Sequence, residues 1–209
     1  MIYAIILAAG QSRRMGCQKL LLPFGDRTVI GRVVSEVRRS TVTEVLVVIG
    51  PDGRGIAGAL AGWRVSIVTN PNPDGDMLSS VRCGLRAVPA QCETILVAVG
   101  DQPAITADLI NEMIRAFRTT GKGVVVPVHD GKRGHPLLFT TGYRDEILTR
   151  YDGVGLRGLV QAHADDLFEL KVAASAVLSD MDYPEDYRRE LARLAPRSDR
   201  PGVKVPAGP

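Results

Sequence analysis

Five short apolar runs, rich in β-branched residues, constrain the fold more than any other feature of this sequence. Each run is apolar nearly throughout rather than alternating, which predicts strands that are covered on both faces, as in a parallel sheet. Stretches with helical spacing separate the runs, and this alternation favours right-handed crossovers in a doubly wound, mainly parallel α/β sheet. The predicted strands are 2–8, 44–50, 65–70, 94–100 and 123–128, and the predicted helices between them are 28–39, 53–61, 77–88 and 106–119.

The chain is less regular after residue 128. There "HDGKRGHPLLF" predicts a turn followed by a strand, and 142–149 and 155–162 predict short helices. "DLFEL" and "SAVLSDMD" are predicted as short strands. "PEDYRRELARLA" predicts a helix that Pro184 opens, with acidic residues in its first turn.

Size and composition narrow the class of protein. A chain of 209 residues suits one domain, predicted over 1–195, and the Pro- and Gly-rich segment 196–209 predicts a disordered tail. The net charge of +3 is too small to indicate nucleic acid as a partner. Three cysteines without a CxxC pair suit no disulfide framework, which predicts a cytoplasmic protein. No membrane association is expected, because the run 2–8 is too short to span a bilayer.

A small basic loop, "GQSRRMGCQK", follows the first predicted strand. In an open α/β sheet, ligands bind beyond the carboxyl ends of the strands. Gly10 lets backbone N–H groups approach phosphate oxygens, while Arg14 and Lys19 neutralise their charge. The loop matches neither the GxxxxGK[ST] nor the GxGxxG fingerprint. It predicts a site for an anionic ligand, and a solvated basic turn is the alternative.

Carboxylates follow two other predicted strands. Asp101 ends "TILVAVGD" and suits a hard cation such as Mg²⁺, although an aspartate at such a place taken alone more often begins a turn. "DMDYPED" adds Asp180 and Asp182 from a distant segment. Cationic groups for phosphate together with carboxylates for a metal ion predict phosphoryl or nucleotidyl transfer.

The motif "LAAGQSRRMGCQKLLLPFG" resembles the LAAGxSxRMGxxKLLLP signature of the MobA-like nucleotidyltransferases, above all their molybdenum cofactor cytidylyltransferase branch. "MLSSVRCGL", "VAVGDQPAIT", "GKRGHPLLF" and "DMDYPEDY" extend the resemblance to about residue 190. It implies a Rossmann-like fold of the nucleotide-diphospho-sugar transferase type. It also implies Mg²⁺-dependent transfer of CMP from CTP to the terminal phosphate of the molybdopterin cofactor, with release of pyrophosphate. A molybdenum hydroxylase or its insertion chaperone is a further expected partner.

The resemblance also implies roles for single residues. Arg14, Lys19 and Asp101 are expected to be catalytic, and Asp101 and Asp182 to hold Mg²⁺. The nucleotide is expected to contact Leu7, Ala8, Ala9, Gly10, Ser12, Arg14, Lys19 and Asp101. The residues expected to bind the acceptor are Ser79, Ser80, Gly134, His135 and Pro136. The two serines are also predicted to cap a helix near 81–88, and a turn histidine is the alternative for His135.

The choice of base is predicted from two motifs. Guanylyltransferases of the family read LAGG where this chain reads "LAAG", and the methyl group of Ala9 narrows the space beside the base in favour of cytosine. "GDQP" in place of their GDMP indicates the same. Asp76 stands where the family has glycine, and it either lies outside the site or joins the metal ligands. Cys17, inside the basic loop, is predicted to be a thiol that the transfer does not use.

Other functions stay open on the sequence alone. A related nucleotidyltransferase that uses GTP or another phosphorylated acceptor would share the basic loop and Asp101. A non-catalytic molybdenum cofactor carrier would not need a metal site. An NAD-dependent oxidoreductase would need a GxGxxG fingerprint, which is absent here.

Overall fold

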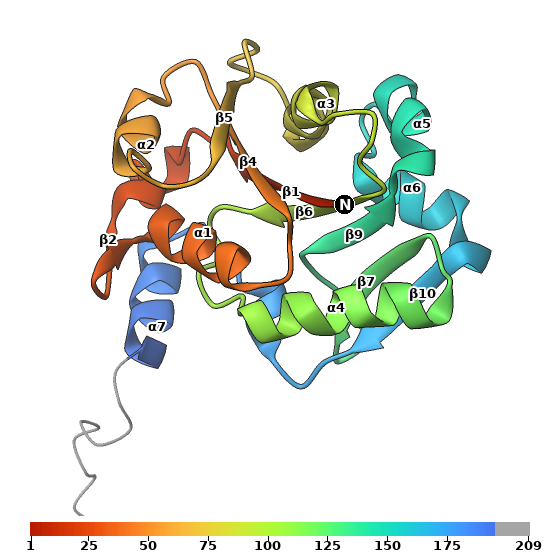
Figure 1. Cartoon of the computed structure of the whole chain (residues 1–209). Helices are drawn as coiled ribbons and strands as arrows, with labels where there is room; N and C mark the ends of the chain where they lie inside the picture. The colour runs from red at the N-terminus through yellow and green to blue at the C-terminus, as the bar shows by residue number, and fades with distance from the viewer. Residues whose placement is uncertain (195–209) are drawn as a thin grey trace, which may run out of the picture.

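The structure is a computed structural model, and it describes residues 1–194. A central mixed sheet has the strand order β10-β7-β9-β6-β1-β4-β5, and the short β8 pairs with β7 (Figure 1). A separate ribbon joins β2 (Pro23–Phe24) to β3 (Arg27–Thr28). The strands of the sheet are β1 (Ile2–Ala8), β4 (Glu44–Ile49), β5 (Ser66–Thr69), β6 (Thr94–Val99), β7 (Val124–His129), β8 (Lys132–Arg133), β9 (Leu137–Thr140) and β10 (Leu167–Lys171).

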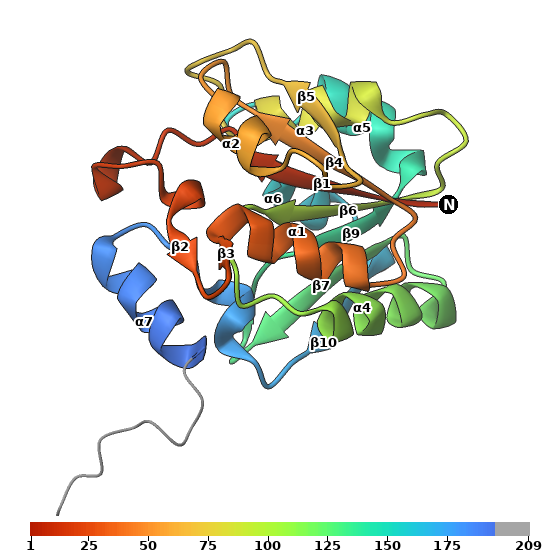
Figure 2. The ribbon, with the colours of Figure 1, turned by 60° about the vertical axis from the view of Figure 1, so that its left-hand side comes forward.

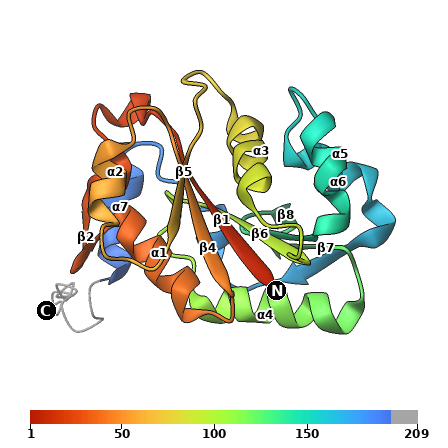
Figure 3. The ribbon, with the colours of Figure 1, turned by 45° about the horizontal axis from the view of Figure 1, so that its top comes forward.

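Helices cover both faces of this sheet, with α1 and α4 on one face and α3, α5 and α6 on the other (Figure 3). They are α1 (Val29–Arg39), α2 (Arg54–Ala59), α3 (Met77–Ala87), α4 (Ala107–Thr120), α5 (Arg144–Thr149), α6 (Leu156–Ala162) and α7 (Pro184–Leu194). The strands and helices predicted before residue 128 are confirmed to within a residue or two. The prediction of one domain over 1–195 stays a prediction, and the predicted tail at 196–209 lies outside the described residues.

Two hydrophobic clusters, one on each face, explain why the strands lack an alternating pattern. Ile6 packs into the cluster under α1 and α4, whereas its neighbour Ile5 packs into the cluster under α3, α5 and α6. Both side chains are fully buried. Successive side chains of a strand point to opposite faces, so a strand that is covered on both sides must be apolar throughout. The doubly wound, mainly parallel sheet is therefore confirmed.

The sheet contains one reversal that its sequence pattern does not reveal. β9 lies between β6 and β7 and runs antiparallel to both of them. The pairs β1–β4, β1–β6, β4–β5 and β7–β10 are parallel. β6 and β7 therefore run in the same direction, joined through α4, and β9 fills the place between them.

The strand predicted for "SAVLSDMD" is wrong. Ser175–Leu178 forms a 3-10 turn, and the following residues up to Pro184 have no regular structure. The physical reason is that this segment makes isolated hydrogen bonds to other parts of the protein and does not pair along its length with a strand. The amide of His135 donates to the carbonyl oxygen of Val177 (2.9 Å), and Asp180 accepts a side-chain hydrogen bond from Gln102.

The start of α3 also differs from the sequence prediction. The N-cap is Asp76, whose carboxylate accepts a hydrogen bond from the amide of Ser79 (2.8 Å). Ser79 and Ser80 therefore lie inside the first turn, so the prediction that they cap the helix is wrong. Asp76 fits the position because its short carboxylate satisfies an amide that the helix itself leaves unpaired.

The last helix lies beside the β2–β3 ribbon (Figure 2). The Tyr187 hydroxyl on α7 donates to the carbonyl oxygen of Pro23 in β2 (2.6 Å). The segment that precedes α7, with Asp182, is thereby held close to the loop that precedes β2. Among residues 1–194, no helix is long and apolar enough to cross a membrane.

Candidate active site

A cavity of about 470 Å³ lies where β1 and β6 end. This is the edge of an open α/β sheet where ligands are expected. Its walls come from the ends of the two strands, from the loop after β1, from the loop that precedes α3, and from the segment before α7. The lining residues are Leu7, Ala8, Ala9, Gly10, Gln11, Ser12, Arg13, Arg14, Lys19, Leu20, Pro73, Asp74, Gly75, Asp76, Met77, Ser80, Val99, Asp101 and Asp182.

The floor of the cavity depends on close packing between the ends of β1 and β6. The Gly100 amide donates to the carbonyl oxygen of Leu7 (2.9 Å). A Cβ atom at Gly100 would lie 2.9 Å from the same oxygen, which is too close for an ordinary contact. Glycine at this position therefore lets the chain turn directly at the end of β6, and Asp101 follows at the cavity.

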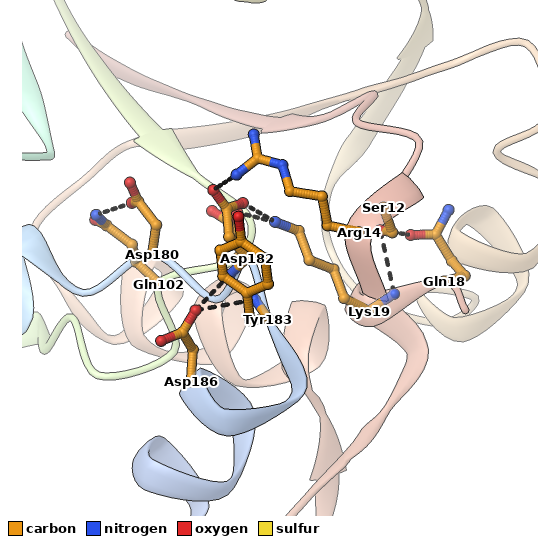
Figure 4. Close-up of polar contacts among 10 residues, drawn as sticks. Ser12, Arg14, Gln18, Lys19, Gln102, Asp180, Asp182, Tyr183 and Asp186 are labelled. Atoms are coloured by element: carbon orange, nitrogen blue, oxygen red, sulfur yellow. Dashed lines mark hydrogen bonds and ion pairs between the residues drawn. The ribbon is translucent and has the colours of Figure 1, made fainter. Parts of the chain in front are cut away.

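Four charged side chains meet on one side of this cavity (Figure 4). Lys19 Nζ lies 2.5 Å from Asp101 Oδ2 and 3.2 Å from Asp182 Oδ1. The Arg14 guanidinium lies 2.7 Å from Asp182 Oδ2 and stacks 5.6 Å from the ring centroid of Tyr183. Residues far apart in the sequence are thus brought together, as the sequence predicted for Arg14, Lys19, Asp101 and Asp182.

The protonation of Lys19 follows from its surroundings. Only 9% of the residue is exposed, and burial alone would lower its pKa, but the charges and hydrogen bonds of Asp101 and Asp182 outweigh burial and raise the pKa. Asp182 likewise raises the pKa of Arg14. Both side chains therefore remain positively charged at neutral pH, so Lys19 is suited to stabilise anions and not to act as a base.

Ser12 shapes the basic loop. It adopts a left-handed conformation (φ 49°) just before the 3-10 turn Arg13–Met15. Its Oγ accepts a hydrogen bond from the Lys19 amide (3.2 Å) and lies 3.1 Å from Gln18 Oε1. Together these contacts fold the loop back on itself, so that Arg14 and Lys19 reach the same carboxylate.

Sequence reasoning missed the residues that hold the opposite wall. Asn70 is 3% exposed, and its side-chain amide donates to the hydroxyl oxygens of Ser79 and Ser80 (3.1 Å each). Gln11 reaches across to the carbonyl oxygen of Pro73 (2.6 Å). The polar run "NPNPDG" after β5 was the available signal, but it does not indicate which of its residues form hydrogen bonds or with which partners.

The donor set of the site fits a divalent metal ion. Within residues 1–194 there is no group of three or more His, Cys, Asp or Glu side chains arranged to hold a metal. Asp101 and Asp182 nevertheless direct one oxygen each at the same ammonium group, so these two oxygens are close together. Mg²⁺ in nucleotide sites is usually bound by one or two carboxylates together with phosphate oxygens, and two carboxylates therefore suffice.

Four of the residues predicted to bind the acceptor do not line this cavity. Ser79 lines a second cavity, beside Asn70, and Ser80 alone of the predicted acceptor residues lines the first. Pro136 is buried and His135 is half-buried. Burial lowers the pKa of His135, although the charges of Asp180 and Asp101 act in the opposite direction. Gly134, His135 and Pro136 precede β9, and their acceptor role stays a prediction.

Gln102, the third residue of "GDQP", is also absent from the cavity lining. It is 1% exposed, and its side chain faces Asp180 (Figure 4). No contact in the described structure therefore accounts for the predicted influence of this glutamine on the base.

Residues 4–167 match the family model described as the MobA-like NTP transferase domain. The chain belongs to the MobA-like NTP transferase family. The resemblance that the sequence motifs predicted is thereby confirmed. The matched range contains Arg14, Lys19 and Asp101, whereas Asp182 lies beyond it.

Similar MobA-like proteins include two curated transferases. The chain is 26% identical over 187 residues to the molybdenum cofactor cytidylyltransferase of Escherichia coli strain K12, covering 89% of this chain and 93% of that protein. It is 27% identical over 202 residues to the molybdenum cofactor guanylyltransferase of Mesorhizobium japonicum, covering 92% and 95%.

Among solved structures, Rv0371c from Mycobacterium tuberculosis H37Rv superposes with a TM-score of 0.82 at 26% identity, covering 91% of this chain and 97% of that one. A second structure of Rv0371c, a complex with manganese, gives a TM-score of 0.77 at 25% identity, with the same coverage. The fold is that of the nucleotide-diphospho-sugar transferases, and this chain is a nucleotidyltransferase of the MobA-like family.

Proposed function

We propose that this MobA-like nucleotidyltransferase transfers CMP from CTP to the terminal phosphate of the molybdopterin cofactor and releases pyrophosphate. The observation that carries the proposal is the position of Lys19, a buried cation between Asp101 and Asp182 at the cavity where β1 and β6 end. A triphosphate requires cationic groups and carboxylates for its metal ion in one place, and this arrangement supplies both.

The proposed reaction exchanges one P–O bond for another. An oxygen of the acceptor phosphate attacks the α-phosphorus of the nucleotide, and the bond to the β-phosphate breaks with its electron pair leaving on pyrophosphate. The acceptor oxygen is already nucleophilic, so the protein needs to align the groups and offset negative charge rather than supply a base. Lys19 and Arg14 are the cations for this task, since both line the cavity and both are positively charged at neutral pH.

Asp101 and Asp182 would hold Mg²⁺ together with the phosphate oxygens of the nucleotide. The ion would withdraw electron density from the α-phosphate and neutralise the departing pyrophosphate. The manganese complex of Rv0371c supports a divalent metal ion in this family fold. Lys19 compensates the charge of the same two carboxylates in the structure.

The proposal of CTP as the nucleotide rests on Ala9. This residue lines the cavity, as do Leu7, Ala8 and Gly10 before the basic loop. A methyl group at this position reduces the space beside the base and thus favours cytosine over the larger guanine. The cytidylyltransferase of Escherichia coli supports the same choice, and it also supports the molybdenum cofactor as the acceptor.

A second candidate keeps the mechanism and changes the base. The guanylyltransferase of Mesorhizobium japonicum is as similar to this chain as the cytidylyltransferase is. GTP is therefore the main alternative to CTP. A different phosphorylated acceptor would likewise leave the roles of Lys19, Arg14 and Asp101 unchanged.

Pyrophosphate release tests the proposal. The purified protein with Mg²⁺ is incubated with CTP, GTP, ATP or UTP, each with and without molybdenum cofactor. We expect release with CTP only when the cofactor is present. Release with GTP would assign the second candidate. Nucleotide binding without release for any of the four nucleotides would contradict transferase activity and favour a carrier of the cofactor.

A further inference from the structure

A buried polar contact joins the two segments that carry the metal-binding carboxylates. Gln102 directly follows Asp101, and its side-chain amide donates to Asp180 Oδ1 (2.7 Å). Asp180 stands two residues before Asp182. Asp101 and Asp182 are the two carboxylates that contact Lys19. The hydrogen bond between Gln102 and Asp180 (Figure 4) therefore links a residue next to the first carboxylate with a residue two positions before the second.

The segment around Asp182 is fixed on both sides of that residue. Met181 is fully buried in the cluster under α1 and α4. On the other side, Asp186 accepts hydrogen bonds from the amides of Asp182 (3.1 Å) and Tyr183 (2.9 Å). The segment is otherwise irregular, so no strand ladder holds it, and these few contacts determine where its carboxylate lies.

A third segment closes the same cluster. The Val177 carbonyl oxygen accepts from the amide of His135 (2.9 Å) and lies 3.5 Å from Gln102 Nε2. A Cβ atom at Gly134 would lie 2.1 Å from that oxygen, so only glycine permits this approach. Gln102 therefore sits where the segments 100–102, 134–135 and 177–182 meet.

Packing alone does not explain a glutamine at this place. The side chain is 1% exposed, and its Oε1 finds no hydrogen-bond partner within residues 1–194. Burying an unpaired amide oxygen costs stability, and an apolar residue of similar size would avoid that cost. The hydrogen bond to Asp180 is what the glutamine contributes and methionine cannot.

We propose that Gln102 is a positioning residue for the metal site, which sets the separation of Asp101 and Asp182 through its hydrogen bond to Asp180. The inference rests on the proposed function in that it takes these two carboxylates as the metal ligands. It assigns the glutamine of "GDQP" to metal affinity and not to recognition of the base. Partners that orient metal ligands typically change metal affinity by about 10–100-fold when they are removed.

Direct measurement of Mn²⁺ binding tests this inference without turnover. The electron paramagnetic resonance signal of free Mn²⁺ is followed during titration of the full chain in the presence of CTP. Gln102→Met removes the donor and Asp180→Ala the acceptor, while Asp180→Asn keeps an oxygen that can accept. Gln161→Met, on an exposed position of α6, is the matched control.

We expect Gln102→Met and Asp180→Ala each to weaken Mn²⁺ binding about tenfold, and the double variant to be no weaker than either single variant. Asp180→Asn should lie closer to the wild type. Relative affinity for CTP and GTP, measured by competition, should not change. Unchanged Mn²⁺ affinity in both single variants, or a changed base preference in Gln102→Met, would overturn the inference.

The outcome is separable from the proposed function. A wild-type protein that binds Mn²⁺ and CTP but releases no pyrophosphate would contradict transferase activity and leave this test in place. If Gln102→Met fails to fold, Asp180→Ala tests the same hydrogen bond from its other end.

Discussion

At the scale of single residues, Lys19 is the side chain on which the proposed chemistry depends most. Lys19→Met keeps the length of the side chain and removes its charge from between Asp101 and Asp182. Loss of one group that stabilises developing charge typically lowers kcat by about 10²–10³-fold, and we expect a loss of that size here. Pyrophosphate release under saturating nucleotide measures it.

Lys171→Met is the matched control, because Lys171 is an exposed residue of β10 that does not line the cavity. Circular dichroism of both variants separates loss of activity from loss of fold. A Lys19→Met variant that is folded and turns over within a few-fold of the wild type would refute the catalytic role.

The residues of this site were not equally predictable. Asp101 comes just after β6, and the loop that carries Arg14 and Lys19 comes after β1. The carboxyl ends of parallel strands share one edge of a sheet, so sequence order brings these two segments to the same edge. Gln102 and Asn70 also follow strands, but the partner of Gln102 lies in an irregular segment and the partners of Asn70 lie in the first turn of α3. Which atoms meet there depends on tertiary packing, for which neither periodicity nor a local motif provides information.

At the scale of the element, the N-cap of α3 contributes to the free energy of unfolding, and this contribution can be measured on its own. Asp76→Ala removes the carboxylate that accepts from the Ser79 amide, and loss of an N-cap costs about 1 kcal/mol in the free energy of unfolding. Urea denaturation measures the change. Asp76→Asn should recover most of it, since asparagine caps about as well, whereas Glu112→Ala removes an exposed charge from within α4 and should have little effect.

Asp166 joins the turn before α5 to the start of β7. Asp166 accepts hydrogen bonds from the Tyr143 hydroxyl and the Gly123 amide, and these two bonds lower its pKa despite partial burial. A carboxylate whose pKa is lowered by folding stabilises the protein above its unfolded pKa, near 4, and that contribution is lost as the pH falls through the folded pKa.

Tyr143→Phe should therefore lower the free energy of unfolding by about 1 kcal/mol at pH 7, and the difference from the wild type should shrink below about pH 4. Urea midpoints at pH 7 and pH 3 measure it. Tyr3→Phe is the control, because Tyr3 is half-buried like Tyr143 but belongs to β1. A difference that stays constant with pH would contradict the assignment to Asp166.

At the scale of the whole molecule, the sequence was sufficient for the layers of the fold but not for the full topology. Apolar runs such as 44–49 are covered on both faces of the sheet, and they are apolar nearly throughout because of that burial. The composition of Leu137–Thr140 would suit a parallel strand as well as an antiparallel one. The insertion of β9 between β6 and β7 was therefore not predictable from the sequence. The strand expected for "SAVLSDMD" failed for a related reason, because its apolar residues Val177 and Met181 are buried although the segment forms no ladder with a strand.

Because the cavity joins the loop after β1 to the distant segment before α7, its occupancy should stabilise the whole molecule. A ligand that binds only the folded state at 100 times its Kd adds about 2.7 kcal/mol. In a chain of this size each kcal/mol raises Tm by about 2–4 °C. CTP with Mg²⁺ should therefore raise Tm by about 5–10 °C, and excess EDTA should remove most of the shift because the carboxylates then repel the triphosphate.

Differential scanning fluorimetry of the wild type, Asp101→Asn and Asp52→Asn tests this linkage. Asp101→Asn should lose most of the shift, since it removes a carboxylate that contacts Lys19 at the cavity, whereas Asp52→Asn, an exposed aspartate before α2, should keep it. An equal shift with and without EDTA would mean that the nucleotide binds without a metal ion. That outcome would contradict the role of Asp101 and Asp182, and Lys19 and Arg14 would then be the main phosphate ligands.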